Sequence, residues 1–303
     1  ILGKYTDGIL GRLIDLLAVF ALLAGTATTF SLATPLMASV IGELFHVELN
    51  RTVVTIIILV LTCVVYTYSL LHGFKGISFL AKSCIYLFFG LLAYVFLFGG
   101  ETKYIIETGF SAIGRVAQNF FQLATYTDPQ RTTSFPQTWT IFYWAYWMVW
   151  CVATPFFIGN ISRGRTVRQT IFGGYLFGCG STIISFIILG NYSLGQQIAG
   201  VADYVAMYQK NGDLYSIIIA IIRTLPCAPL ILALLFITMV AFYATSFDSI
   251  ALIGACYSYH KLGENESPHK LIELMWCVLL IALPIALVFS DSSMSNLQSV
   301  SII

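Results

Sequence analysis

Four of the five tryptophans in this chain of 303 residues lie between Trp139 and Trp150. In an α-helix Tyr143, Trp147 and Trp150 are spaced i, i+4 and i+7, so their rings share one face over two turns. The negative face of an aromatic ring attracts a cation, and quaternary ammonium groups, which cannot donate hydrogen bonds, are bound in aromatic cages for this reason. The spacing predicts such a cage, with ordinary packing or a membrane-interface belt of aromatic residues as the alternative.

Two adjacent hydroxyl residues, Thr245 and Ser246, follow Phe242 by about one helical turn and form a second group. Sodium prefers oxygen ligands, which two hydroxyls and the backbone carbonyls beside a helix irregularity can supply. Hydroxyls in membrane helices more often bond back to the carbonyl four residues earlier, so the residues alone leave both hypotheses open. Asp248 lies on the same stretch, and a charge inside a membrane is costly enough to indicate a function.

The composition places both groups in a membrane protein. Hydrophobic residues make up 58% of the chain and charged residues only 10%, with a mean hydropathy of +0.86. A soluble domain carries about 25% charged residues, so this chain has too few to cover a surface in water. The net charge of +1 also removes the clustered cations that a nucleic-acid partner would need.

Continuous apolar runs, rather than short alternating segments, favour transmembrane helices over a transmembrane barrel. A helix needs about 20 mostly apolar residues to cross the bilayer. By that measure the chain is a single all-α membrane domain with seven spans, and the tail after Asn296 begins an eighth. The spans are expected near 13–36, 52–71, 77–99, 139–159, 170–190, 229–257 and 271–290.

The loops between the spans indicate the orientation of the chain. Arg163 and Arg165 belong to the densest basic loop, which is therefore expected on the cytoplasmic side. They either fix the topology only or also contact neighbouring protein or anionic lipid. Two long connections, 101–126 and 194–226, have the pattern of amphipathic helices on the outer membrane face, with a break in the second at Asn211-Gly212.

The run F-Y-W-A-Y-W-M-V-W, followed by I-S-R-G-R-T-V-R from Ile161 to Arg168, resembles the signature of the betaine/choline/carnitine transporter family. Members of that family show an F-Y-W-A-W-W stretch and then an I-S-R-G-R-T loop. The likeness extends over nearly the whole chain and includes G-T-A-T-T-F-S-L-A-T before residue 35 and A-T-S-F-D-S at residues 244–249.

The resemblance implies a leucine-transporter-like helical bundle of two inverted five-helix repeats, of which this chain would hold a part. The chain would begin at the fifth of the family's twelve spans and lack the C-terminal end. The resemblance also implies a multi-pass protein of the plasma (inner) membrane that assembles as a homotrimer.

Matched to the family position by position, Trp147 and Trp150 would hold the trimethylammonium group. Tyr146 stands where the family usually has Trp, which implies an altered outer contact with the substrate. Phe142 and Tyr143 match the family pattern and would support the cage.

The family's sodium site would correspond to Phe242, Thr245 and Ser246, with sodium as coupling ion and no other cofactor. A second family sodium site falls on Leu22, Thr26 and Ala153, where only Thr26 keeps a hydroxyl, so we expect that site to be weak or absent.

The family's sodium-independent antiporters replace the ion with an Arg and a Met. Those two positions read Cys84 and Thr154 here, and the nearest cation, Lys82, is two residues away from the first of them. The two positions therefore disfavour the antiporter hypothesis.

These observations predict secondary active transport of a quaternary-ammonium compound by sodium symport with alternating access, and osmoprotection as the physiological role. They do not distinguish glycine betaine, choline and carnitine. The alternative within the family is a carnitine/butyrobetaine antiporter. Outside it, the alternatives are a structural or channel subunit and a membrane-embedded enzyme, which would need His, Asp or Glu side chains that converge inside the bilayer.

Overall fold

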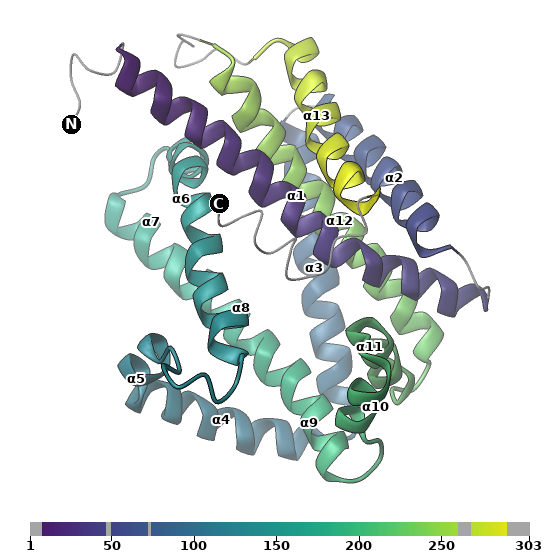
Figure 1. Ribbon diagram of the computed structural model, residues 1–303. Coiled ribbons are helices and arrows are strands. Elements are labelled where there is room, and N and C mark those ends of the chain that lie inside the picture. Colours follow the sequence, from purple (N-terminus) through teal and green to yellow (C-terminus); the bar gives the residue numbers. More distant parts are fainter. Residues whose placement is uncertain (1–7, 47–49, 72–73, 260–267, 290–303) are drawn as a thin grey trace.

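The computed structural model describes residues 8–46, 50–71, 74–259 and 268–289, and every regular element within these ranges is a helix (Figure 1). The fold class predicted from the sequence, an all-α membrane protein, is confirmed. The elements are α1 (Ile9–Phe45), α2 (Arg51–Leu71), α3 (Phe74–Phe98), α4 (Thr102–Gln118), α5 (Phe120–Thr125), η2 (Pro136–Ile141), α6 (Phe142–Ile161), α7 (Val167–Gly173), η3 (Gly174–Cys179), α8 (Gly180–Ser185), η4 (Phe186–Gly190), α9 (Asn191–Ile198), α10 (Tyr204–Asn211), α11 (Leu214–Arg223), α12 (Ala228–Tyr257) and α13 (Lys270–Phe289).

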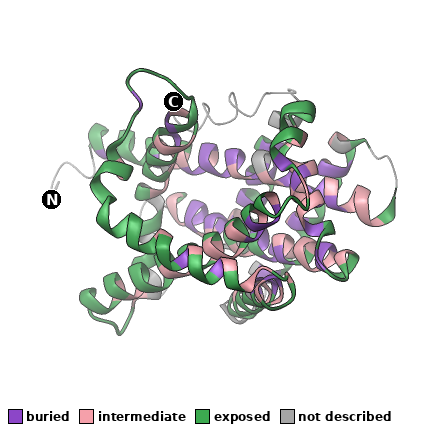
Figure 2. Cartoon of the chain, turned by 90° about the horizontal axis from the view of Figure 1, so that it is seen from below, coloured by how far each residue is buried: buried purple, intermediate pink, exposed green. Residues whose placement is uncertain are grey.

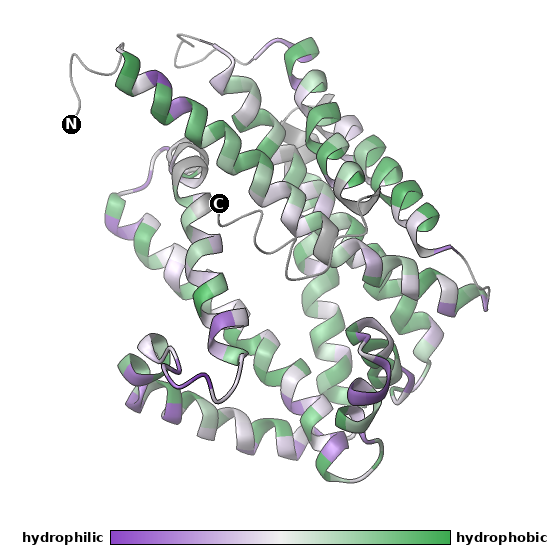
Figure 3. Cartoon of the chain, viewed as in Figure 1, coloured by the Kyte–Doolittle hydropathy of each residue, from purple (hydrophilic) through white to green (hydrophobic). Residues whose placement is uncertain are grey.

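Long apolar helices dominate the structure. Within the described ranges, five stretches are long and apolar enough to cross a membrane: Ile9–Phe45, Thr52–Ser69, Ser78–Phe98, Val167–Ile198 and Ala228–Tyr257. Hydrophobic residues predominate along these helices (Figure 3), and many of their large apolar residues, such as Leu16, Ile57 and Phe79, are exposed. Buried residues gather on one side of the molecule (Figure 2). An apolar exterior of this kind is suited to lipid rather than water. The count of seven spans stays a prediction, and the tail after Asn296 lies outside the described residues.

The helices α1, α2, α12 and α13 pack around the ring of Phe247, which is fully buried. Phe30 of α1 meets this ring edge-on at a centroid distance of 3.6 Å, and Tyr66 of α2 stacks on it at 5.1 Å. The Tyr66 hydroxyl donates to the carbonyl of Cys277 on α13 at 2.6 Å. One aromatic cluster therefore joins all four helices.

The two long connections form short helices at one end of the molecule, opposite the α6–α7 connection (Figure 1). The first is α4 and α5, and the second runs through α10 and α11. Gly212, in a left-handed conformation with φ of 63°, ends α10 at the break expected from the sequence. The Arg223 Nε donates to Glu43 Oε1 at 2.6 Å, which ties α11 to the end of α1.

The helix that carries the tryptophans starts from a loop organised by Asp128. One oxygen of this carboxylate accepts the backbone N–H of Thr133 at 2.8 Å and the hydroxyl of Thr132 at 2.9 Å. The side-chain amide of Gln137, in the π-helical turn η2 before α6, donates to the Thr127 carbonyl at 2.8 Å. The bonds to the carboxylate, first of all the one from the Thr133 N–H, hold the pKa of Asp128 below its ordinary value.

The crossing of α12 and α13 depends on a glycine. A Cβ at Gly254 would lie 2.7 Å from ring atoms of Trp276, which is buried and whose indole N–H donates to Ser258 Oγ at 2.8 Å. Because this ring is held in place, Gly254→Ala should destabilise the protein by about 1–3 kcal/mol through overpacking. Thermal unfolding in detergent should show a lower Tm. Gly90→Ala, where a Cβ would meet nothing within 4 Å, is the control and should keep or raise the Tm.

The Asp128 loop should loosen in acid. Because the folded-state pKa of Asp128 lies below the ordinary 3.8, its carboxylate stabilises the loop above that pH and loses this effect as the pH falls through the folded pKa. Pepsin cleavage between residues 126 and 135, normalised to an unstructured reference peptide, should therefore accelerate steeply below about pH 3.8. Asp128→Asn should be cut rapidly at every pH, and the exposed Glu107→Gln should behave as wild type. Equal pH profiles for wild type and Asp128→Asn would contradict this assignment.

Candidate functional site

A cavity of about 440 Å³ lies between α1, α6 and α12 and brings the tryptophan helix opposite the hydroxyl-bearing helix. Its volume is within the range of small-ligand pockets. The residues that line it are Leu22, Thr26, Thr29 and Phe30 from α1, Tyr146, Trp147, Trp150 and Thr154 from α6, and Tyr243, Ser246, Phe247, Ser249, Ile250 and Ile253 from α12.

Tyr146 is at the centre of the aromatic residues on α6. Its ring meets Trp150 at a centroid distance of 6.1 Å and Trp147 at 6.4 Å, both close to perpendicular. Trp147 is 64% exposed, so this indole offers an open face to a ligand. The predicted cage residues Trp147 and Trp150, together with Tyr146, thus border one space.

The two supporting residues of the predicted cage differ in their surroundings. Phe142 is buried behind Tyr146 and stacks on it at 5.4 Å with an interplanar angle of 27°, so it supports the ring from outside the cavity. Tyr143 is half exposed and borders a neighbouring hollow with Trp139, Trp144 and Trp147 instead. The aromatic run therefore borders two spaces, and Trp147 lines both of them.

The structure adds a residue that the sequence analysis missed. The hydroxyl of Thr29 on α1 is hydrogen-bonded to the hydroxyl of Tyr146 on α6. Thr26 and Thr29 are three residues apart, a spacing that places both on the same face of a helix. From that spacing the sequence could have indicated that Thr29 shares a helix face with Thr26. Nothing in the sequence indicated which helix this face would contact.

The predicted sodium ligands are divided between two faces of α12. Ser246 lines the cavity. Thr245 instead lies beside the buried Cys84 of α3. Phe242 packs edge-on against Phe88 of α3 at a centroid distance of 5.6 Å. The structure therefore brings one of the three to the aromatic residues and places the other two toward α3.

We expected a helix irregularity beside Thr245 and Ser246. This expectation was wrong, because α12 is a continuous α-helix from Ala228 to Tyr257. The Thr245 hydroxyl donates to the Ala241 carbonyl at 2.7 Å, the bond back along the helix that is common for hydroxyls in such helices. Asp248 lies on this helix, but its side chain is outside the described part of the structure.

Thr26, the remaining residue of the second predicted sodium site, is buried and lines the same cavity. Its hydroxyl donates to the Leu22 carbonyl, so its one proton is used within α1. The side chain of Ala153 is not among those described. Arg163 and Arg165 are exposed in the α6–α7 loop, away from the cavity, where Gly164 turns the chain with a φ of 82°.

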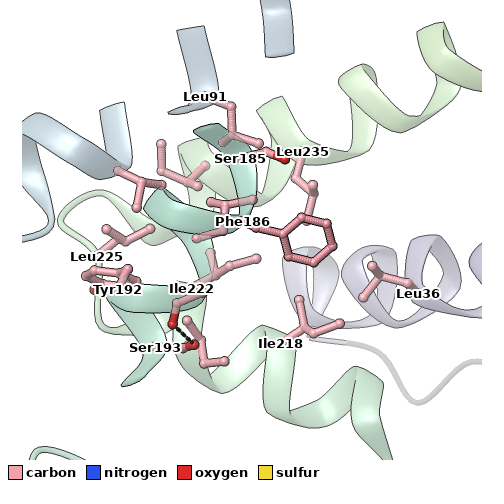
Figure 4. Close-up of a pocket in the computed structure, with 15 residues that line it drawn as sticks. Leu36, Leu91, Ser185, Phe186, Tyr192, Ser193, Ile218, Ile222, Leu225 and Leu235 are labelled. Atoms are coloured by element: carbon pink, nitrogen blue, oxygen red, sulfur yellow. Dashed lines mark hydrogen bonds between the residues drawn. The ribbon is translucent and has the colours of Figure 1, made fainter. Parts of the chain in front are cut away.

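A second cavity, of about 500 Å³, lies between α1, α3, η4, α9, α11 and α12 (Figure 4). Aliphatic residues such as Leu36, Ile218 and Leu235 form most of its wall. Its two serines, Ser185 and Ser193, donate to the carbonyls of Thr182 and Gly190, three residues earlier, at 2.8 and 2.9 Å. With only Phe186 and Tyr192 as aromatic side chains, it lacks the clustered indoles that would attract an organic cation.

The chain is similar to known transporters. The chain is 28% identical over 302 residues to the uncharacterized transporter YeaV of Escherichia coli (strain K12) and 26% identical over 302 residues to a carnitine transporter of Acinetobacter baumannii. It is 29% identical over 310 residues to the betaine/ectoine transporter LcoP of Corynebacterium glutamicum. These matches cover 99% of this chain but 62%, 54% and 47% of the three relatives, respectively.

The model of one protein family matches the chain over residues 1–303, its whole printed length. That family is described as the betaine/carnitine/choline family of transporters. Together with the apolar helices long enough to span a bilayer, the match identifies an integral membrane protein. The chain belongs to the betaine/carnitine/choline transporter family.

Proposed function

We propose that the protein carries out secondary active transport of a quaternary-ammonium compound and that the cavity between α1, α6 and α12 binds it. The observation that carries the proposal is the meeting of Tyr146, Trp147 and Trp150 around one space of suitable volume. The printed names of two relatives, a carnitine transporter and a betaine/ectoine transporter, support this class of substrate. Membership in a family of transporters sets aside the hypothesis of a membrane-embedded enzyme.

In the proposed mechanism the trimethylammonium group leaves water and rests against the indole rings of Trp147 and Trp150. The methyl groups cannot donate hydrogen bonds, so the attraction comes from the negative ring faces, and it strengthens as water is excluded. One wall of the cavity is α6 and the other is formed by α1 and α12. A movement of α6 relative to α1 and α12 would open the cavity to either side of the membrane, as alternating access requires.

Sodium coupling through Thr245 and Ser246 is part of the proposal. Two contacts support it: Ser246 reaches the cavity, and Cys84 lies against Thr245. Cys84 is the position at which the resemblance places an Arg in the sodium-independent antiporters, and a thiol cannot supply that positive charge. Lys82 is exposed on α3 and does not line the cavity, which disfavours the antiporter alternative.

A homotrimer, which the resemblance implies, belongs to the same proposal. The amphipathic helix α4 presents Phe110, Ile113 and Val116 outward, with 75%, 47% and 51% of each residue exposed. An apolar row on an outer helix is a suitable contact for a second copy of the chain.

Trp147→Ala should weaken substrate binding. Loss of one cation–π face of about 1–2 kcal/mol corresponds to a rise in the Kd of about fivefold to thirtyfold. Binding of radiolabelled glycine betaine, carnitine and choline to the purified protein in lipid nanodiscs measures the effect. The matched control is Trp144→Ala, because Trp144 is equally exposed on the same helix but does not line the cavity. Equal affinities of the two variants would exclude Trp147 from the site.

Replacement of sodium by potassium should lower the affinity of the wild-type protein for its substrate. Ser246→Ala and Thr245→Val should raise the sodium concentration for half-maximal binding by about tenfold, since each removes an oxygen ligand from a hard cation. The control is Thr238→Val on the same helix, because the Thr238 hydroxyl donates to Leu234 at 2.7 Å and does not line the cavity. Identical wild-type binding in the two salts would rule out sodium coupling and favour exchange.

A further inference from the structure

The hydrogen bond between Thr29 and Tyr146 has a direction. The Thr29 hydroxyl donates its proton to the Gly25 carbonyl at 2.8 Å, within α1. A threonine hydroxyl has only one proton, and so it can only accept in its second bond. The Tyr146 hydroxyl must therefore be the donor to Thr29.

The ring of Trp150 meets that of Tyr146 edge-on, at a centroid distance of 6.1 Å. The donors run in one sequence, from Tyr146 to Thr29 and from Thr29 to the Gly25 carbonyl. With its own proton turned toward α1, the phenol has none left to donate into the cavity.

This arrangement determines which chemical group fits beside Tyr146. A phenol oxygen that exposes only lone pairs attracts a positive group and repels a carboxylate, which is itself an acceptor. A tryptophan, which the family resemblance places at this position, has a donor and no acceptor. The tyrosine with its threonine partner is therefore a feature of this chain's own site.

On the basis of the proposed function, we propose that Thr29 and Tyr146 are positioning residues of the quaternary-ammonium site. By accepting the phenol proton, Thr29 keeps the Tyr146 oxygen turned as an acceptor toward the ammonium end of the substrate. The same bond holds Trp150 in its edge-on contact with Tyr146 and ties α6 to α1. The anionic end of a zwitterionic substrate then points away from Tyr146.

The test is the Kd of glycine betaine for the purified protein in lipid nanodiscs. Thr29→Val keeps the side-chain shape without the hydroxyl, and Tyr146→Phe removes the other partner. Each should raise the Kd by about threefold to tenfold, the usual effect of one hydrogen bond. Because the two groups act as one unit, the double variant should be no weaker than the weaker single variant. Thr29→Ser, which retains the hydroxyl, should restore wild-type affinity.

The matched control is Thr62→Val, because the Thr62 hydroxyl is buried and donates only along its own helix, to Ile58 at 2.8 Å. Tetramethylammonium, which lacks an anionic end, should lose affinity by the same factor as glycine betaine in both single variants. A loss confined to glycine betaine would overturn the proposed orientation. A Kd for Thr29→Val equal to that of Thr62→Val, or additive effects of the two single variants, would overturn the positioning role.

A ligand-free measurement separates this inference from the proposed function. Thr29→Val and Tyr146→Phe should each lower the melting temperature of the protein, whether or not a substrate binds. The melting temperature of the double variant should be no lower than that of the less stable single variant. If wild type binds neither glycine betaine, carnitine nor choline, the proposed function fails, and the pair is only a link between helices. If wild type binds and the variants bind equally well, the inference alone fails.

Discussion

The packing of three rings, Phe30, Phe247 and Tyr66, holds the structure together at the point where α1, α2 and α12 meet. In a bilayer the lipid tails are as apolar as the side chains, so helices associate through close packing and hydrogen bonds rather than through the hydrophobic effect. Buried rings in edge-on and stacked contact supply this packing, and the bond from Tyr66 to the Cys277 carbonyl adds α13.

The same rings determine how the cavity can work. Phe30 and Phe247 form part of its wall, so the wall made by α1 and α12 belongs to the buried core cluster that joins α1, α2, α12 and α13. The opposite wall, α6, is joined to α1 by the polar bond between Tyr146 and Thr29. Trp150 of α6 packs against the same core cluster, so a movement of α6 would have to break both this apolar contact and the hydrogen bond to Thr29.

The sequence predicted the membrane class, the helical nature of the chain and the family, because these depend on composition, on long apolar runs and on a local motif. It also placed Trp147 and Trp150 together, since the spacing within a single helix is fixed by helix geometry. The partner of Tyr146 could not be predicted in this way. Which face of α1 meets α6 is decided by packing between segments more than a hundred residues apart.

The error at α12 has a similar cause. The sodium-site hypothesis invoked a helix irregularity that would free backbone carbonyls, but α12 is continuous and the bond from Thr245 back to Ala241 satisfies the hydroxyl without breaking the helix. Adjacent residues on a helix point about 100° apart, so Thr245 and Ser246 separate onto the α3 side and the cavity side. The structure therefore places one hydroxyl of the pair at the cavity and the other beside α3.

The ion pair between Arg223 and Glu43 makes one contact between helices sensitive to the salt concentration of the surrounding solution. Its arginine side chain is 60% exposed, at the end of the molecule expected to face the exterior. Dissolved ions screen exposed charges, with a screening length of about 8 Å at physiological salt and about 3 Å at 1 M. The contribution of this ion pair to the attachment of α11 to α1 is thus largest in dilute solution and weakens as the salt concentration rises.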